Sequence, residues 1–524
     1  MKSIVLSGFM ATGNSTVARA LAARLGLPLV DTDDEIEKLT KKSIADLWRD
    51  EGEPKFRARE HDLVKKLLAD PSPRVLAFGG GTVTNRETRH LALDRALVVT
   101  LTASPETSVD RAGPLENRPN LAFADPVARA KELIDARAAA YAECHLSLAT
   151  DGISVDAIVD AIVPLSARAP IAMPLGARSY VVDVVDDHPD ALTDAVAKLA
   201  PSSLVVVTDS NVHRARGKAL HTALDALAVP WTELTLAPGE SYKNIASVGA
   251  IWDAALGANA DRDSVIVAFG GGVVGDLAGF AASSLLRGVR FVGVPTTLLS
   301  MVDASVGGKT GFDHPAGKNL IGSFHQPSAV VADLAHLATL PARDLACGFA
   351  EIVKIALTRD ADFFERIEST ANQAKSGDRT ILAEYIRRSI ELKAEVVRDD
   401  EREAGDRAIL NFGHTVGHAL EAHGGYAKHR HGEAVAIGML VELALGAELG
   451  FAPKDLLART RGVLEKLGLP TSVPHAELEA AWSYINSDKK RSGKTLKLPL
   501  PSQLGRAEVH RVPVSSLVLP KLPM

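Results

Sequence analysis

The segment GFMATGNST, which begins at Gly8, combines residue types that hold phosphate in many enzymes. Gly8 and Gly13 lie five residues apart, after an apolar run and before a helical pattern, so backbone N–H groups would point at an anion there. Ser15 and Thr16 follow, and a hydroxyl at this place holds magnesium. Asn14 stands where such loops carry lysine, and losing a charge-assisted contact to phosphate costs about 1.5–3 kcal/mol. The spacing therefore predicts a phosphate-binding loop without its usual cation.

Histidines in the second half of the chain have the spacing of metal ligands. His414 and His418 are four residues apart in a helical pattern, which places both imidazoles on one helix face, and His431 follows in HRHGE. These imidazoles with one carboxylate would make a zinc site, and spacing alone favours the pair His414 and His418. Basic residues gather in the same half, as a phosphorylated and carboxylated substrate would require. They are Arg287, Lys309, Lys318, Lys354, Lys393, Arg407, Lys489 and Lys490.

A glycine-rich turn, AFGGGVVGD, places Gly270, Gly272 and Gly275 in the GxGxxG register directly after a predicted strand. The standard dinucleotide fingerprint also has an acidic residue about 20 positions later to hold the ribose. Residues 285–302 offer none near the expected place. Asp209, at the end of another predicted strand, is the better candidate for a ribose contact.

The elements that must position these residues follow from hydrophobic periodicity. Up to about residue 165, short β-branched runs such as residues 4–6 alternate with helical patterns such as residues 15–25 and 35–51. This alternation predicts a parallel sheet with crossover helices. Three prolines between residues 164 and 176 interrupt the pattern and predict a linker. Strands and helices alternate again to about residue 335, after which long helical patterns predict a mostly α-helical part.

Composition restricts the class of protein. The chain has 524 residues, a length typical of about three domains, with 46% hydrophobic residues, 24% charged residues and a net charge of −6. These values predict a soluble protein without a bulk electrostatic reason to bind nucleic acid. Two cysteines make a disulfide framework implausible and favour the cytoplasm. The N-terminus only superficially resembles a signal peptide, and no apolar run predicts a membrane span.

Five motifs follow the phosphate loop in a fixed order: Asp31-Thr32-Asp33, Phe56-Arg57, Gly79-Gly80-Gly81, Arg118-Pro119 and Arg137-x3-Tyr141. In this order and spacing the first 165 residues resemble shikimate kinase. The resemblance implies that Asp33 is the catalytic base and that shikimate is held by Asp33, Arg57, Gly79, Gly80, Gly81 and Arg137. It implies ATP contacts from Gly8, Gly13, Asn14, Ser15, Thr16, Arg111 and Arg118, with Mg²⁺ at Ser15 and Asp31. Asn14 and the lid sequence Arg118-Pro119-Asn120-Leu121 depart from the family pattern, and both lie on the nucleotide side.

Nine further motifs span the rest of the chain: PGESYKN (238–244), GGGVVGD (270–276), PTTLLSMVDASVGGKT (295–310), GKNLIGSFHQP (317–327), AEIVK (350–354), LKAEVV (392–397), LNFGHTVGH (410–418), HGEAV (431–435) and DKK (488–490). Together they resemble 3-dehydroquinate synthase from about residue 170 to 520. The resemblance implies conversion of 3-deoxy-arabino-heptulosonate 7-phosphate to 3-dehydroquinate and phosphate, with NAD used but not consumed. A transient oxidation acidifies the neighbouring proton, so that phosphate can leave.

The same resemblance assigns residues. Zinc, with cobalt as an alternative, is held by Glu351, His414 and His431, so His418 faces the substrate. The implied NAD contacts are Asp209, Glu240, Lys243, Gly271, Gly272, Asp276, Thr296, Thr297, Lys318 and Thr339. The implied substrate contacts are Arg287, Asp303, Lys309, Asn319, Lys354, Lys393, Arg407, Asn411, His418 and one of Lys489 and Lys490. Those expected to be catalytic are Asp303, Lys309, Lys354, Lys393, Arg407, Asn411 and His418. Arg287 would reach the phosphate across the interface of a homodimer.

The predicted fold is therefore α/β, with a P-loop kinase-like parallel sheet, a synthase-like nucleotide-binding α/β domain and an all-α metal-binding domain. The predicted limits are 1–165, a linker at 166–177, 178–335 and 336–524. Small molecules are the expected partners. Three alternatives remain open: a kinase shell that only binds or regulates, a fusion that merely joins two enzymes, and a metal-dependent polyol dehydrogenase in the second half. Phosphate-binding lysines argue against the last of these.

Overall fold

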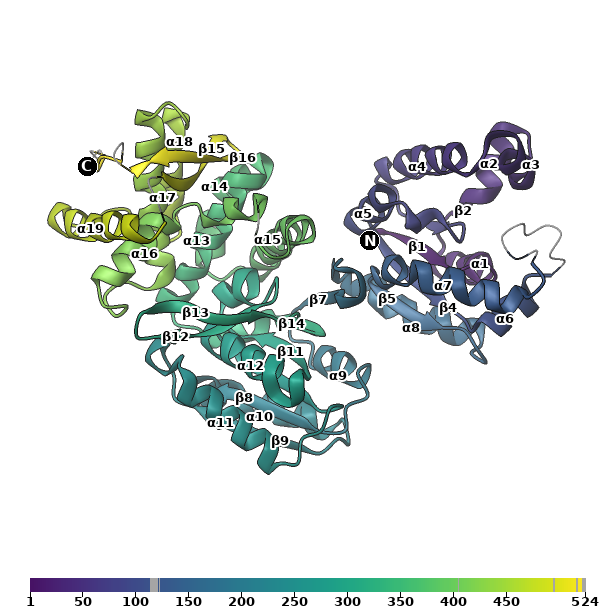
Figure 1. Cartoon of the computed structure of the whole chain (residues 1–524), viewed down its shortest axis with the longest axis horizontal. Helices are drawn as coiled ribbons and strands as arrows, with labels where there is room; N and C mark the ends of the chain where they lie inside the picture. Colours follow the sequence, from purple (N-terminus) through teal and green to yellow (C-terminus); the bar gives the residue numbers. More distant parts are fainter. Residues whose placement is uncertain (114–120, 122, 404, 493–494, 515–516, 521–524) are drawn as a thin grey trace. The chain divides into compact units, whose positions relative to one another are not determined.

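The computed structural model describes residues 1–520 except 114–120, 122, 404, 493–494 and 515–516. The chain divides into two compact units, Met1–Asp183 and Val184–Met524 (Figure 1). Each has its own hydrophobic cores. Among the described residues no helix combines the length and the apolar character needed to span a bilayer.

The first unit is built on a parallel five-stranded sheet of order β2-β3-β1-β4-β5. Its strands are β1 (Ser3–Gly8), β2 (Leu29–Asp31), β3 (Val75–Ala77), β4 (Ala96–Thr102) and β5 (Leu146–Ala149). In the central strand, Ile4 stands beside Val75 of β3 and Leu97 of β4, and all three are fully or almost fully buried. Every residue of β1 is buried, including Ser3 and Ser7, as expected for a strand covered on both faces. The carboxyl ends of β1 and β3 therefore meet at one edge, where ligands bind in such sheets.

Helices follow the strands of this unit and bury the two faces of the sheet. They are α1 (Asn14–Leu25), α2 (Thr32–Thr40), α3 (Ile44–Glu51), α4 (Glu53–Ala69), α5 (Arg86–Arg95), α6 (Pro105–Arg111), α7 (Pro126–Ala142) and α8 (Val155–Arg168). The helix predicted over residues 35–51 is two helices. Lys41 adopts a left-handed conformation that ends α2, and the hydroxyl of Ser43 caps α3 by accepting from the Asp46 amide.

The next α/β part of the chain, whose first strands begin before Val184, contains a sheet of order β6-β7-β14-β11-β10-β8-β9 and a hairpin of β12 and β13. The strands are β6 (Ile171–Met173), β7 (Tyr180–Val185), β8 (Leu204–Asp209), β9 (Trp231–Leu236), β10 (Val265–Gly270), β11 (Arg290–Pro295), β12 (Lys309–His314), β13 (Gly317–Phe324) and β14 (Ala329–Asp333). Its helices are α9 (Asp190–Ala197), α10 (Ser210–Asp225), α11 (Ile245–Gly257) and α12 (Gly272–Ser284). The buried central strands β8, β10 and β11 are parallel, so their carboxyl ends share one edge.

Seven helices follow: α13 (Ala342–Arg359), α14 (Ala361–Lys375), α15 (Arg379–Asp399), α16 (His414–His423), α17 (His431–Glu448), α18 (Lys454–Lys466) and α19 (His475–Ser492). The chain then forms an antiparallel hairpin of β15 (Thr495–Gln503) and β16 (Arg506–Pro513), which packs against this helical part. The α/β fold with a kinase-like sheet and a helical last part is confirmed, but the hairpin corrects the expectation that this last part is entirely helical.

The predicted domain limits stay predictions. Residues 166–177 include the end of α8, the short strand β6 and the start of a 3-10 turn, Gly176–Arg178, so much of the proposed linker has regular structure. The division between the two compact units falls within β7.

Candidate active sites

The phosphate loop of the first unit joins β1 to α1, as its sequence predicts. A Cβ on Gly8 would lie 2.2 Å from the carbonyl oxygen of Leu101, so only glycine fits there. Gly13 has φ of 103° and precedes the first helical residue, a conformation that favours glycine. Ser15 donates a hydrogen bond to Asp31 at 2.6 Å, which brings together the two predicted magnesium residues. The loop amides, the start of α1 and this pair form a candidate nucleotide site.

The side chain of Asn14 folds back onto the loop. Its amide nitrogen lies 3.4 Å from the carbonyl oxygens of both Gly8 and Phe78, and its oxygen accepts a hydrogen bond from Thr12 at 3.2 Å. Asn14 therefore holds the loop to the segment after β3. It brings no positive charge to the phosphate position.

The residues predicted to hold shikimate surround the glycine turn after β3. A Cβ on Gly79 would lie 2.7 Å from Oδ1 of Asp33, and a Cβ on Gly81 would lie 2.1 Å from a guanidinium nitrogen of Arg57. Arg137 donates to the carbonyl of Gly80 at 3.3 Å. Because these glycines have no side chains, the neighbouring side chains fit closely against the turn. One carboxylate and two guanidinium groups therefore surround the glycine turn.

Carboxylates position Arg57 in this cluster. Arg57 pairs with buried Glu60, and with Glu53 at 3.2 Å. Thr82, which follows the glycine turn, donates to the other oxygen of Glu60 at 2.7 Å. Burial lowers the pKa of Arg57, but the charges of Glu60 and Glu53 outweigh it and raise that pKa. Arg57 is therefore a fixed cation, suited to a carboxylate or hydroxyl ligand.

The structure places two further residues predicted to contact ATP, Thr16 and Arg111. Thr16 is exposed in the first turn of α1. Arg111 ends α6 and donates to the hydroxyl and the carbonyl of Thr150 at 2.9 and 3.0 Å. Arg118 lies outside the described residues.

In the second unit, three helices bring Glu351, His414 and His431 together. Glu351 belongs to α13, whereas His414 and His431 are the first residues of α16 and α17. Oε1 of Glu351 lies 3.6 Å from Nε2 of His414 and 3.4 Å from Nε2 of His431. One potential ligand atom from each residue lies within 4.8 Å of the other two. These are the three residues that the family resemblance implied, and His418, Glu421 and His431 form a second possible group that shares His431.

The donor set fits a divalent cation. Glu351 is 3% exposed, and neither of its oxygens makes a hydrogen bond of good geometry with a described residue, although Lys354 pairs with it. Burial lowers the pKa of His414 to about 3, so this imidazole is neutral and can offer a lone pair. Two imidazoles and a carboxylate are a common zinc ligand set in enzymes that leave a fourth position open.

A hydrogen-bond acceptor beside Nδ1 orients the imidazole of each histidine in this cluster. Nδ1 of His414 lies 3.2 Å from the carbonyl of Phe412, and Nδ1 of His431 lies 3.4 Å from Oε2 of Glu421. In each case the other ring nitrogen faces Glu351, as in metal sites whose ligands are held by a second hydrogen bond. Burial opposes protonation of His431, but the adjacent carboxylates of Glu351 and Glu421 raise its pKa to about 10. The cluster therefore attracts positive charge.

Two buried lysines adjoin this cluster. Lys354 lies one helical turn after Glu351, and Lys393 of α15 reaches Asp303 in a π-helical turn, Ser300–Ala304. Nζ of Lys393 also donates to the carbonyl of Asp303 at 2.6 Å. Burial lowers the pKa of Lys393, although the Asp303 carboxylate opposes this shift. Burial would raise the pKa of Asp303, but the charge of Lys393 holds it at about 2.

Glu403 joins two of the predicted substrate residues. Its carboxylate pairs with Lys309 and accepts a hydrogen bond from Asn411 at 2.6 Å. Buried Arg407 donates to the carbonyls of Glu401 and Gly307 at 2.5 and 3.3 Å. Glu403 was not predicted as a site residue, yet its carboxylate occupies the place where two predicted anion-binding groups converge.

A second charged cluster joins the predicted NAD residues. Nζ of Lys243 lies 2.6 Å from both Asp276 and Oδ1 of Asn319. Lys318 pairs with Glu240 at 3.1 Å and with Glu421 at 3.2 Å. Glu421 thus contacts both the predicted cofactor residues and His431.

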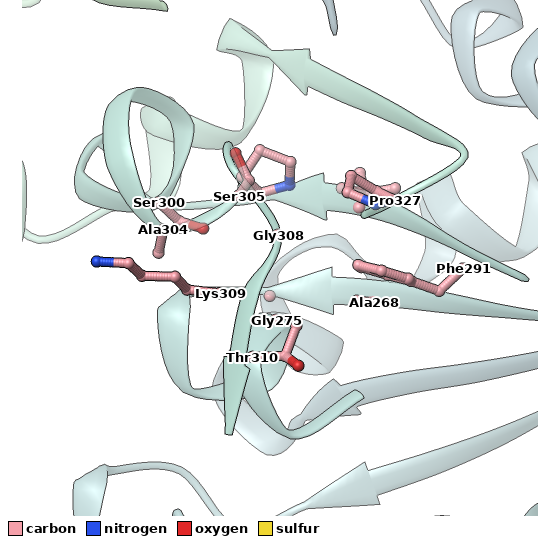
Figure 2. A pocket seen from close by; sticks show the side chains of 14 residues that line it. Ala268, Gly275, Phe291, Ser300, Ala304, Ser305, Gly308, Lys309, Thr310 and Pro327 are labelled. Atoms are coloured by element: carbon pink, nitrogen blue, oxygen red, sulfur yellow. The ribbon is translucent and has the colours of Figure 1, made fainter. Parts of the chain in front are cut away.

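The glycine-rich turn lies at the carboxyl end of β10. Gly271 precedes α12, and a Cβ on it would lie 3.2 Å from Thr297. The amide of Thr296 donates to the carbonyl of Gly270 at 3.0 Å, which fixes the neighbouring strand ends. A cavity of about 20 Å³ beside this turn is lined by Gly270, Gly275 and Lys309 among others, and Lys309 extends away from Phe291 and Pro327 (Figure 2). This volume suits a water-sized group, so the cavity is too small for a dinucleotide.

The remaining predicted residues are spread more widely. Asp209 caps α10 by accepting from the Asn211 and Val212 amides at 2.8 and 3.1 Å. His418 lies beside the metal cluster, with its ring centroid 5.3 Å from that of His414. Gly272 follows Gly271 as the first residue of α12. Thr339 donates to the carbonyl of His336, and Arg287 is exposed. The side chains of Lys489 and Lys490 lie outside the described part.

Fold and sites together define a two-enzyme chain, in which a phosphate-loop kinase domain precedes an α/β and helical unit with a metal-type site. Residues 10–165 match the family model for shikimate kinase. Residues 233–347 match the N-terminal model of 3-dehydroquinate synthase, and residues 348–491 match its C-terminal model. The 3-dehydroquinate synthase of Acinetobacter baylyi is 46% identical over 308 residues, which cover 59% of this chain and 85% of that relative.

Two solved structures also resemble the second unit. The 2-epi-5-epi-valiolone synthase ValA of Streptomyces hygroscopicus, with NAD⁺ and Zn²⁺ bound, is 30% identical with a TM-score of 0.58, over 64% of this chain and 94% of that one. A 2-deoxy-scyllo-inosose synthase in complex with carbaglucose-6-phosphate, NAD⁺ and Co²⁺ is 26% identical with a TM-score of 0.60, over 66% and 97% of the two chains. The chain belongs to the 3-dehydroquinate synthase family and carries a shikimate kinase domain ahead of it, as its motifs predicted.

Proposed function

We propose that the second unit converts 3-deoxy-arabino-heptulosonate 7-phosphate into 3-dehydroquinate and phosphate. The observation that supports this reaction best is the juxtaposition of a buried carboxylate-imidazole cluster with the lysines Lys354 and Lys393. A cation site next to buried ammonium groups suits a substrate that carries both a hydroxyl to be oxidised and a phosphate to be expelled. The family of the chain and the sugar phosphate analogue on one solved relative agree with this substrate class.

The proposed cofactors are NAD and Zn²⁺, with Co²⁺ as a substitute. When bound, they would supply a reversible hydride acceptor and a Lewis acid. Glu351, His414 and His431 would hold the metal. The cluster of Glu240, Lys243, Asp276 and Lys318, with the glycine turn and Asp209, would hold NAD.

The chain's own basic groups would bind and orient the substrate. Lys309 and Asn411 now share the carboxylate of Glu403, so an anionic substrate group would replace Glu403 at these two donors. Lys393 and Asp303 form a tightly held pair that would place an ammonium beside a substrate oxygen. Because burial lowers the pKa of Lys393, a proton leaves this ammonium more readily than it leaves an exposed lysine.

The test uses the full chain loaded with zinc and NAD and supplied with the heptulosonate phosphate. We expect equal amounts of phosphate and 3-dehydroquinate, with no build-up of NADH absorbance. Steady release of NADH would instead support the polyol dehydrogenase alternative, and no turnover would contradict the proposal. Glu351→Gln should abolish product formation in the same assay, because the metal cluster loses its carboxylate charge.

We further propose that the first unit phosphorylates shikimate with MgATP, although slowly. The support is the cluster of Asp33, Arg57 and Arg137 around the glycine turn, together with the hydrogen bond from Ser15 at the start of α1 to Asp31 at the end of β2. Asp33 would accept the hydroxyl proton of the substrate while the two arginines hold its carboxylate. Asn14 supports the alternative that this unit only binds ligands or regulates. Phosphate transfer to shikimate above that of an Asp33→Asn variant supports the kinase, whereas equal rates would support the alternative.

We also propose a homodimeric protein of the cytoplasm that acts on small molecules and not on nucleic acid. The exposed position of Arg287 is compatible with a contact to a second copy. Sedimentation of the full chain tests the dimer, and a monomer at assay concentrations would contradict it.

A further inference from the structure

Besides the two groups of potential metal ligands that share His431, another group lies on α10 and β9. Nδ1 of His213 lies 2.7 Å from Oε1 of Glu233, and Nε2 of His221 lies 2.7 Å from Oε2 of the same carboxylate. One ligand atom from each of the three residues lies within 4.8 Å of the other two. Their side chains are 45%, 35% and 12% exposed, so an ion from solvent can reach them.

The two imidazoles converge although their backbones are far apart. His213 and His221 are eight residues apart on α10, which corresponds to about 12 Å along a helix axis. Their ring centroids are nevertheless only 5.8 Å apart. Gly217, midway between them, makes this possible, since a Cβ there would lie 3.1 Å from Nδ1 of His213.

Neighbouring contacts hold two of the three residues in place. Glu233 accepts a hydrogen bond from Thr235 at 2.9 Å, and the ring of His221 lies 4.9 Å from that of Trp231. Each oxygen of the Glu233 carboxylate therefore already faces one imidazole nitrogen, on the side where an ion would bind.

An open hollow lies over the imidazoles. His213, Lys218, His221 and Thr222 are among the residues that line it. A metal ion held by the three side chains would therefore have a coordination position facing solvent. Lys218 beside that position favours water or a small anion as the fourth ligand.

We propose that His213, His221 and Glu233 form a second divalent-metal site, for Zn²⁺ or a similar nitrogen-preferring ion. Two imidazoles and one carboxylate suit such ions, whereas Mg²⁺ and Ca²⁺ prefer oxygen ligands only. Tetrahedral zinc separates its ligand atoms by about 3.3 Å, so each nitrogen would move away from its carboxylate oxygen by roughly 0.6 Å. The ion would replace the two hydrogen bonds to Glu233 and tie α10 to β9.

The test counts ions on the full chain. Chelator-treated protein is dialysed against Zn²⁺ and its metal content is measured, with Co²⁺ absorption as a second readout. We expect His221→Ala to bind one ion fewer per chain than the parent protein, while His475→Ala, which removes an exposed histidine outside this group, leaves the count unchanged. The metal content is also compared between Glu351→Gln and a double variant with Glu351→Gln and His221→Ala. We expect the same difference of one ion per chain, whether or not the cluster around Glu351 binds metal.

A second variant retains all three ligands. Gly217→Ala adds a methyl group that presses on the His213 ring, so zinc affinity should fall about tenfold or more, although alanine favours the helix. The Glu351→Gln variant should also gain thermal stability when Zn²⁺ is added, and the double variant that carries Glu351→Gln and His221→Ala should not. Equal ion counts in the parent protein and His221→Ala would overturn the proposal, and so would zinc affinity unchanged by Gly217→Ala.

Discussion

At the scale of single residues, Asn14 provides no positive charge at the phosphate position of the candidate kinase site. Its side chain is engaged with the carbonyls of Gly8 and Phe78, so it stabilises the loop and does not reach outward. Phosphoryl transfer depends mainly on positioning and on stabilising charge, which makes the missing ammonium more serious for the rate than for binding.

Asn14→Lys should therefore raise the rate of shikimate phosphorylation. A restored charge-assisted contact of about 1.5–3 kcal/mol corresponds to a gain of roughly tenfold to hundredfold in kcat/KM for MgATP. Steady-state kinetics with shikimate and MgATP measures it. Asn14→Gln, which lengthens the side chain without adding charge, is the control and should show no such gain. A lysine variant no faster than the parent protein would show that another group limits the rate.

Glu421 is the second residue whose role can be isolated. It is buried, lies 3.4 Å from Nδ1 of His431 and pairs with Lys318. Glu421→Gln keeps the shape but removes the charge that orients this imidazole, so zinc affinity should fall by about 10- to 100-fold. Competition with a chelator measures the affinity. The exposed Glu479→Gln is the control, and unchanged affinity in Glu421→Gln would exclude an orienting role.

Sequence reasoning located most of the residues that the structure brings together, but it missed Glu403 and Glu421. Motif spacing identifies residues that share a helix face, and Glu421 does lie three positions after His418 on α16. This spacing does not distinguish Glu421 from an ordinary surface residue, because acidic residues are common on helix faces. Glu403 gave no local signal, since its partners Lys309 and Asn411 come from distant segments.

At the scale of elements, the start of α16 positions His414. Fully buried Glu442 of α17 accepts hydrogen bonds from the amides of Gly413 and Val416 at 2.7 and 3.1 Å. Burial raises the pKa of Glu442 to about 8, although these amides partly offset the shift. The carboxyl group satisfies helix-start amides that would otherwise be buried without a partner.

Glu442→Gln should destabilise this helix start. Its amide nitrogen would face a backbone N–H, so one buried donor loses its acceptor at a cost of about 1–3 kcal/mol. We expect a lower midpoint of thermal unfolding and weaker zinc binding, because His414 is the first residue of α16. Glu448→Gln at the exposed end of the same helix is the control. An unfolding midpoint equal to that of the control would contradict this account of the cap.

Helices and strands could be predicted where the hydrophobic periodicity of a segment and its length indicated the same type of element. The buried strands β8 and β10 appear where unbroken apolar runs predicted them. The hairpin of β15 and β16 was missed because Pro499, Pro501 and Pro513 argue against strands. Proline is tolerated in edge strands, and both strands of a two-stranded sheet are edges. Which strands are edges is a property of the fold and not of the local sequence.

At the scale of the whole molecule, the described hydrophobic cores separate by unit. The cores around the first sheet draw their residues from the first 172 positions, whereas those of the second sheet begin at Val185. The candidate sites separate in the same way, with Asp33 in one unit and Glu351 in the other. The two proposed reactions also share no intermediate, because 3-dehydroquinate, the product proposed for one unit, is not shikimate, the substrate proposed for the other.

Each activity should therefore survive loss of the other within the full chain. Asp33→Asn should reduce shikimate phosphorylation at least 100-fold, since the proposed base is lost, and leave dehydroquinate formation within about twofold of the parent protein. Glu351→Gln should have the opposite effect, because a buried metal cluster loses its charged ligand while the core of the first unit is untouched. Both assays on one preparation of each variant measure this. If either substitution lowers both activities by a similar factor, the units are coupled and their separate cores do not make them independent enzymes.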